Sequence, residues 1–333
     1  MSSRFVSMFR WCSTLSLLAA VLVLPMAAHS DDNSNTLSQL RADLSQGQLG
    51  VLLQRQDIVP LPASTIKPWI QAQPIDRFAI TGFNESDSRF AARVRLHFPS
   101  GGISFLRLEG TPAKPYTLTD WYDYSSGLRL TALLKEGRWL QSEGGKAFLE
   151  ALGESPNEAR VADLAEGRSA ALTLWLTQCL GKPCERIAAA HQLESEQPMI
   201  WLLRRAIASG DTDQYRQQHD ALLGALGDDA YLWWLEGQYA LEFQQCAWLA
   251  SPLREAWQRH KDELLLADVA LQCTLNHTPE QTTFGTALTR QLSVSTIMDS
   301  VTAFFAAHSR PVPQSWQLWG QTYLSPILPA DQE

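Results

Sequence analysis

A serine and a lysine one helical turn apart are residues whose types and spacing could do chemistry. They lie in the stretch Pro62-Ala63-Ser64-Thr65-Ile66-Lys67. In a helix, Ser64 and Lys67 would share one face, where the hydroxyl could attack a carbonyl group while the amine removed its proton. Pro68 would end that helix directly after the lysine. The prolines spread over residues 60–74 therefore favour a constrained connector.

The same residues resemble the S-x-x-K motif of penicillin-recognising serine enzymes, and the resemblance implies that Ser64 would be the nucleophile. The sequence departs from that family because neither K-T-G nor S-D-N follows. A four-residue match with two fixed positions also arises easily by chance. The serine enzyme is therefore kept as a remote alternative.

An aromatic and acidic cluster occupies residues 120–124. The alternation of a strand places Asp120 and Asp123 on opposite faces, so they cannot form a paired carboxylate site. We expect these acids to bind nearby backbone, or arginines such as Arg93 and Arg95 across strands. The aromatic members would fill the sheet core or, alternatively, line a ligand pocket: Trp121, Tyr122 and Tyr124.

Four cysteines follow the N-terminal region: Cys179, Cys184, Cys246 and Cys273. An even number in an exported chain suits two disulfides. Cys179 and Cys184 flank a turn between two expected helices, while Cys246 starts one helix and Cys273 ends another. We therefore expect the structural pairs Cys179–Cys184 and Cys246–Cys273. A redox role for the first pair is the alternative, although thiol oxidoreductases favour C-x-x-C at a helix start.

The first 30 residues have the layout of a secretory signal peptide. Arg4 and Arg10 precede an apolar run over 15–24, and a small-residue site precedes Asp31. This run is shorter than the roughly 20 residues that a membrane span needs, so a membrane anchor is the less favoured alternative. We expect a periplasmic or secreted protein with no stable membrane span after cleavage.

The net charge and the sequence motifs exclude some classes of partner and cofactor. The formal net charge of −8 would become −10 without Arg4 and Arg10, which argues against nucleic acid as a partner. The histidines show no metal-ligand spacing, and no glycine-rich loop indicates a nucleotide. We therefore expect no metal and no cofactor.

Two domains are predicted after the signal peptide, an α+β domain over 31–160 and an all-α domain over 161–333. The first begins with a helix over 36–54 and ends with a helical pair over 131–152, interrupted by glycines. Two-residue alternation between them predicts an antiparallel meander with strands near 77–84, 89–98, 102–109 and 115–124.

This order of elements, ending in the aromatic strand and turn over 118–127, resembles nuclear transport factor two-like α+β folds that precede helical repeats in some exported bacterial proteins. The proline-rich connector departs from that pattern. The resemblance implies a cone-shaped sheet whose concavity holds a ligand or docks a partner.

The second domain shows apolar helix openings about 30 residues apart, followed by polar turns and second helices near 183–192, 212–225 and 246–259. Such a period is typical of a helical solenoid, and an irregular helical bundle is the alternative. The helix pairs resemble tetratricopeptide repeats with degenerate motifs. The closest spacing to their W-x-x-L-G-x-x-Y pattern, with Trp in place of Leu, is that of Trp316, Trp319, Gly320 and Tyr323.

The adjacent pair Trp233 and Trp234 is the candidate binding site of this array. Adjacent helical side chains point about 100° apart, so the two rings cannot be buried equally. Large aromatic side chains usually fill the core between stacked helices. The alternative is that one of these two rings faces the groove of the repeat and anchors a partner. The sequence thus predicts a non-catalytic protein that binds a protein or peptide. The alternative is a small-molecule binder that uses the concavity of the sheet.

Overall fold

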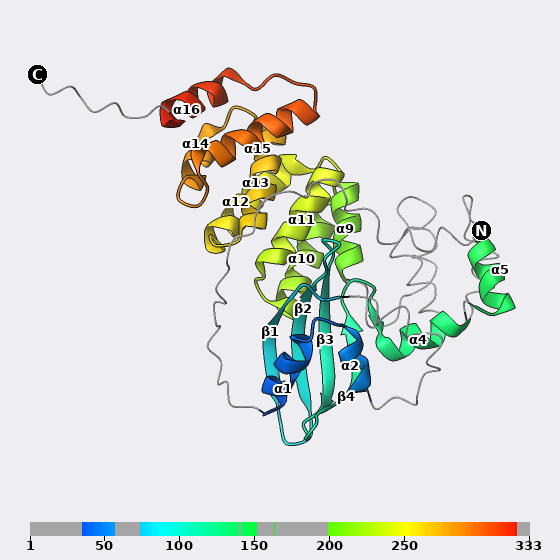
Figure 1. Ribbon diagram of the computed structural model, residues 1–333. Helices are drawn as coiled ribbons and strands as arrows, with labels where there is room; N and C mark the ends of the chain where they lie inside the picture. Colours follow the sequence, from blue (N-terminus) through cyan, green and yellow to red (C-terminus); the bar gives the residue numbers. More distant parts are fainter. Residues whose placement is uncertain (1–34, 57–73, 140, 152–162, 164–198, 325–333) are drawn as a thin grey trace, which may run out of the picture. The chain divides into compact units, whose positions relative to one another are not determined.

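The computed structural model describes residues 35–56, 74–139, 141–151, 163 and 199–324 (Figure 1). The chain divides into two compact units, with the division between Trp201 and Leu202. The expected domain boundary near residue 160 lies outside the described residues. So do the expected signal peptide, the Ser64–Lys67 motif, the Cys179–Cys184 pair and the first repeat.

A five-stranded antiparallel sheet with the order β1-β2-β3-β4-β5 is the centre of the first unit. Its strands confirm the predicted four-stranded meander and add a short fifth strand: β1 (Arg77–Glu85), β2 (Phe90–His97), β3 (Ile103–Thr111), β4 (Thr117–Asp123) and β5 (Leu128–Arg129). Val94 pairs with Leu106 and Leu108 pairs with Trp121, so apolar side chains from neighbouring strands meet on one face.

Two short helices, α1 (Asn35–Leu44) and α2 (Gly50–Gln54), cover that apolar face (Figure 1). The sequence predicted one helix over 36–54, and this prediction is wrong. Gly47 adopts φ +70°, a left-handed conformation that favours glycine and ends α1. Arg55 then folds back to Asp43 with an Nε–Oδ2 distance of 2.8 Å, which ties the two helices together.

The helical pair that follows the sheet consists of α4 (Leu130–Trp139) and α5 (Glu143–Ala151). The break precedes Gly144 and Gly145, which lie inside α5, so the prediction that these glycines interrupt the pair is wrong. Ser142 explains the position of the break. Its hydroxyl accepts a hydrogen bond from the backbone N–H of Gly145 and caps the start of α5.

The second unit is helical from its start to Leu324, as predicted. Its helices follow one another in the order α9 (Met199–Ser209), α10 (Thr212–Leu226), α11 (Ala230–Glu242), α12 (Cys246–Arg259), α13 (Leu264–His277), α14 (Thr282–Leu288), α15 (Val294–Ala307) and α16 (Gln314–Leu324). Residues 289–293 separate α14 from α15. Ser293 caps a new helix there by accepting a hydrogen bond from Thr296 N–H.

Three helices of this unit, α11, α12 and α13, pack against one another (Figure 1). A Cβ atom on Gly237 would lie 2.6 Å from Val269 Cγ2, so only glycine permits this close approach of α11 and α13. The expected Cys246–Cys273 disulfide is present and joins α12 to α13, with a Cα–Cα distance of 5.1 Å. Closing a loop of this length stabilises the fold by roughly 3 to 4 kcal/mol.

Candidate functional site

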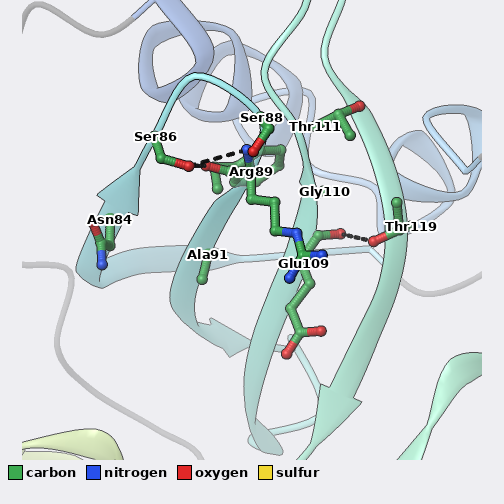
Figure 2. Close-up of a pocket in the computed structure, with 10 residues that line it drawn as sticks. Asn84, Ser86, Ser88, Arg89, Ala91, Glu109, Gly110, Thr111 and Thr119 are labelled. Atoms are coloured by element: carbon green, nitrogen blue, oxygen red, sulfur yellow. Dashed lines mark hydrogen bonds between the residues drawn. The ribbon is translucent and has the colours of Figure 1, made fainter.

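A pocket of about 560 Å³ lies at one end of the sheet (Figure 2). The turn between β1 and β2 forms one side, and the end of β3 with the start of β4 forms the other. Its lining contains hydroxyls, an amide, one guanidinium group and one carboxylate: Asn84, Ser86, Ser88, Arg89, Phe90, Ala91, Glu109, Gly110, Thr111 and Thr119. This lining suits a small polar ligand.

Local hydrogen bonds shape the pocket, as Figure 2 shows. Ser86 donates to the carbonyl of Arg89 from both its backbone N–H and its hydroxyl, at 2.8 and 3.2 Å, which closes the β1–β2 turn. Thr119 Oγ1 donates to the carbonyl of Glu109 at 3.2 Å. A Cβ atom on Gly110 would collide with the Phe90 ring and with backbone of β4, so the pocket wall requires glycine here.

Two arginines hold the carboxylate of Glu109, with Arg107 Nε at 2.7 Å and an Arg129 guanidinium nitrogen at 3.0 Å. Burial opposes ionisation of Glu109, but these two cations outweigh it and keep its pKa below the ordinary value. A carboxylate with a lowered pKa accepts protons poorly. Glu109 is therefore poorly suited to act as a general base.

The aromatic residues predicted as pocket contacts are buried on both faces of the sheet. Trp121 lies in the apolar core beneath α1 and α2. Tyr122 and Tyr124 pack edge to face, with ring centroids 4.9 Å apart, and Arg107 lies 5.3 Å from the Tyr122 ring. Their burial accounts for packing, and their role in binding stays a prediction.

The acids of this cluster bind nearby groups. Asp120 accepts hydrogen bonds from Trp121 N–H and from the Thr131 hydroxyl, at 2.8 and 2.7 Å. Asp123 accepts from Ser126 Oγ at 2.8 Å. The alternative expectation, a cross-strand pairing with arginines on β2, does not fit the topology because β3 separates β2 from β4.

The adjacent tryptophans of α11 differ in exposure. Trp233 is 6% exposed, donates from Nε1 to Asp228 at 2.7 Å, and has the guanidinium of Arg259 at 5.3 Å from its ring. Trp234 is half-buried and lies beside Tyr231, with ring centroids 6.5 Å apart. Trp234 is therefore the member of the pair whose ring a partner could reach.

Trp234 belongs to a face that α11 and α13 build together beside the contact of Gly237 with Val269. On α11, helical geometry places Trp234 and Gln238 next to Gly237. On α13, the incompletely buried residues next to Val269 follow one another at intervals of three and four residues. We call these five residues the α11–α13 face: Trp234, Gln238, Leu265, Asp268 and Gln272. Leu265 is 39% exposed, and its neighbour Leu264 is 44% exposed.

Helix α9 contacts α11 through the side chain of Arg204. Arg204 pairs with Glu242 at 2.6 Å, and its guanidinium group lies 5.5 Å from the Tyr239 ring and 5.3 Å from the Phe243 ring. These contacts join α9 to α11, and α11 packs in turn against α13.

A buried polar cluster between α10 and α11 was not predicted from the sequence. Glu236 is fully buried and accepts hydrogen bonds from Tyr215 Oη and from His219 Nδ1, each at 2.7 Å. Burial raises the pKa of Glu236 against the opposing effect of these hydrogen bonds. Burial alone would lower the pKa of His219, but the attraction of Glu236 outweighs it and raises that pKa.

A second polar network fixes the start of α11. The carboxylate of Asp228 receives hydrogen bonds from His260 and Arg259, each at 3.0 Å, as well as from Trp233. Burial opposes ionisation, but these donors outweigh it and lower the pKa of Asp228 to about 2. The two networks thus position the helix that carries Trp234.

Within the described parts of the chain, no group of three or more His, Cys, Asp or Glu side chains is arranged to hold a metal ion. No described helix combines the length and the apolar character needed to cross a membrane. Comparisons of the chain with protein families, with curated proteins and with solved structures found no match.

Proposed function

We propose that this protein is a non-catalytic, exported protein that binds another protein through the α11–α13 face. The observation that carries the proposal is the half-buried Trp234 on α11 together with the exposed Leu264 and Leu265 on α13, the helix that packs against α11. Aromatic and aliphatic side chains of this kind act as anchors when a partner removes them from water.

The rigidity of the surrounding helices supports this function. The Cys246–Cys273 disulfide joins α12 to α13, and the buried hydrogen bonds of Glu236 join α10 to α11. A surface that is already ordered loses less conformational entropy when a partner binds. The disulfide also agrees with export, because disulfides persist in oxidising compartments.

We further infer that α9–α10, α11–α12 and α13–α14 are helix pairs of a repeat-like stack. The support comes from the packing of α11 against both α12 and α13, and from Arg204, which links α9 to α11. In such a stack the first helices of successive pairs share one face. The α11–α13 face has this position.

A second function, the binding of a small polar ligand in the sheet pocket, is favoured by the hydroxyl-rich lining around Arg89. An anionic ligand group would pair with its guanidinium. Incubation of the full chain with pooled polar metabolites should then raise its Tm, and the Arg89→Ala variant should lose this rise. An equal rise in wild type and variant would contradict this second function.

The leading proposal is tested by tagged full-length protein isolated from its own cells under mild conditions. We expect a partner in near-stoichiometric amount with the wild type and at least fivefold less with Trp234→Ala. Tyr323→Ala is the matched control, because Tyr323 is an aromatic residue 49% exposed on α16. The proposal fails if no partner is lost with Trp234→Ala, or if both variants lose it equally.

A further inference from the structure

The carboxylate of Asp268 lies on the α11–α13 face and is half-buried. It accepts a hydrogen bond from Gln272 Nε2 at 2.8 Å, and it makes no ion pair with the described residues. Burial raises the pKa of Asp268 above the ordinary value, against the effect of that hydrogen bond. A carboxylate in this environment gains stability when a cation approaches it.

Other members of the α11–α13 face suit a basic residue of a partner. Trp234 offers an aromatic ring to a cation, and Leu265 offers an apolar surface to the methylene stem of arginine or lysine. The chain as a whole carries a formal charge of −8, which would attract a basic segment from a distance. Aromatic, apolar and acidic groups therefore coincide on one face.

From this juxtaposition we infer that the partner presents a basic polypeptide segment, in which an arginine or lysine pairs with Asp268 and an adjacent apolar side chain packs on Leu264 and Leu265. This inference rests on the proposed binding function and specifies its partner chemistry. A cation at Asp268 completes the hydrogen bonds of a carboxylate that has one described donor.

A random heptapeptide library displayed on phage and selected against the folded full-length protein tests the inference. The selected peptides should be enriched in arginine or lysine next to leucine or an aromatic residue. They should bind Asp268→Asn at least tenfold more weakly than wild type, and Asp268→Glu should recover part of the loss. The control Asp299→Asn removes an exposed carboxylate from α15 and should leave affinity unchanged.

The outcomes separate the inference from the function on which it rests. Peptides that depend on Trp234 but bind Asp268→Asn normally, or that lack basic residues, would overturn the basic-segment inference alone. Peptides that depend on neither residue would overturn the proposed binding face as well. Circular dichroism of the Asp268→Asn, Asp268→Glu and Asp299→Asn variants should match the wild type, because none of these substitutions removes an apolar core contact.

Discussion

The pKa of a buried histidine is lowered in the sheet unit and raised in the helical unit. In the sheet, Arg95 Nε donates to His97 Nε2 at 3.1 Å, and burial together with Arg95 and Arg77 lowers the pKa of His97 to about 4. In the helices, Glu236 accepts a hydrogen bond from His219 and raises its pKa. Both residues are at most 8% exposed, so neighbouring charges, and not the degree of burial, decide the direction.

Two glutamates repeat this contrast. Glu109, on the sheet, is one-third exposed and is held as an anion by Arg107 and Arg129. Glu236, between helices, has no exposed surface, and burial raises its pKa. The pKa of the sheet glutamate is therefore lowered by its cationic neighbours, whereas the pKa of the helical glutamate is raised by burial.

The largest expected effect comes from removal of the buried acid. Glu236→Ala should lower the free energy of unfolding by about 3 to 5 kcal/mol, because it leaves Tyr215 and His219 buried without their acceptor. Glu109→Ala should cost only about 1 kcal/mol, because its ion pairs are partly exposed to solvent. Urea unfolding followed by tryptophan fluorescence measures both. Equal losses would contradict the difference between the two environments.

Loss of the disulfide should have the next largest effect. Replacing both Cys246 and Cys273 by serine should reduce stability by roughly 3 to 4 kcal/mol, because the unfolded chain regains the entropy of an open loop. Amide hydrogen exchange should accelerate in α12 and α13 and remain unchanged in the sheet strands. Equal acceleration in the sheet would show that the two regions unfold together.

The smallest expected effect concerns pH. Stability from His97 is fully present above pH 6.5, the ordinary histidine pKa, and decreases by about 1 to 3 kcal/mol as the pH falls toward 4. Stability from His219 is fully present below pH 6.5 and is lost as the pH rises through its higher folded-state pKa. Urea unfolding between pH 4 and pH 8 should therefore show a weaker acid-side dependence for His97→Gln and a weaker alkaline-side dependence for His219→Gln.

An NMR titration of the two histidine rings measures these two pKa values directly. The His97 ring should stay neutral as the pH falls until about pH 4, while the midpoint of the His219 titration should lie above the ordinary histidine value. A titration of both rings near the ordinary value would refute the comparison between the two units.

Local patterns were sufficient to predict most elements of the fold. The alternation around Val94 and Leu96 predicted the strands, because one face of β2 is buried and most of its other face is only partly buried. The Cys246–Cys273 pair followed from the expected helix ends. The errors lie at helix ends, where Gly47 ends α1 through its left-handed backbone and Ser142 begins α5 through its cap.

The candidate sites were harder to predict because they depend on tertiary contacts. Glu236 lies 17 residues from His219, and only the packing of α10 on α11 brings them together. One signal was present in the sequence: Tyr215 and His219 are four residues apart, on the same side of α10 as its buried leucines. Asp268 gave no such signal, because an acidic residue on a helix is usually expected to be exposed to solvent.

Hydrogen–deuterium exchange of the full-length protein with its co-isolated partner tests the proposed binding face most directly. The account predicts slower exchange in α11 and α13 when the partner is bound, with no change in the β1–β2 turn or at the start of β4. Protection around the sheet pocket, with α11 and α13 unchanged, would contradict it and assign the binding role to the sheet.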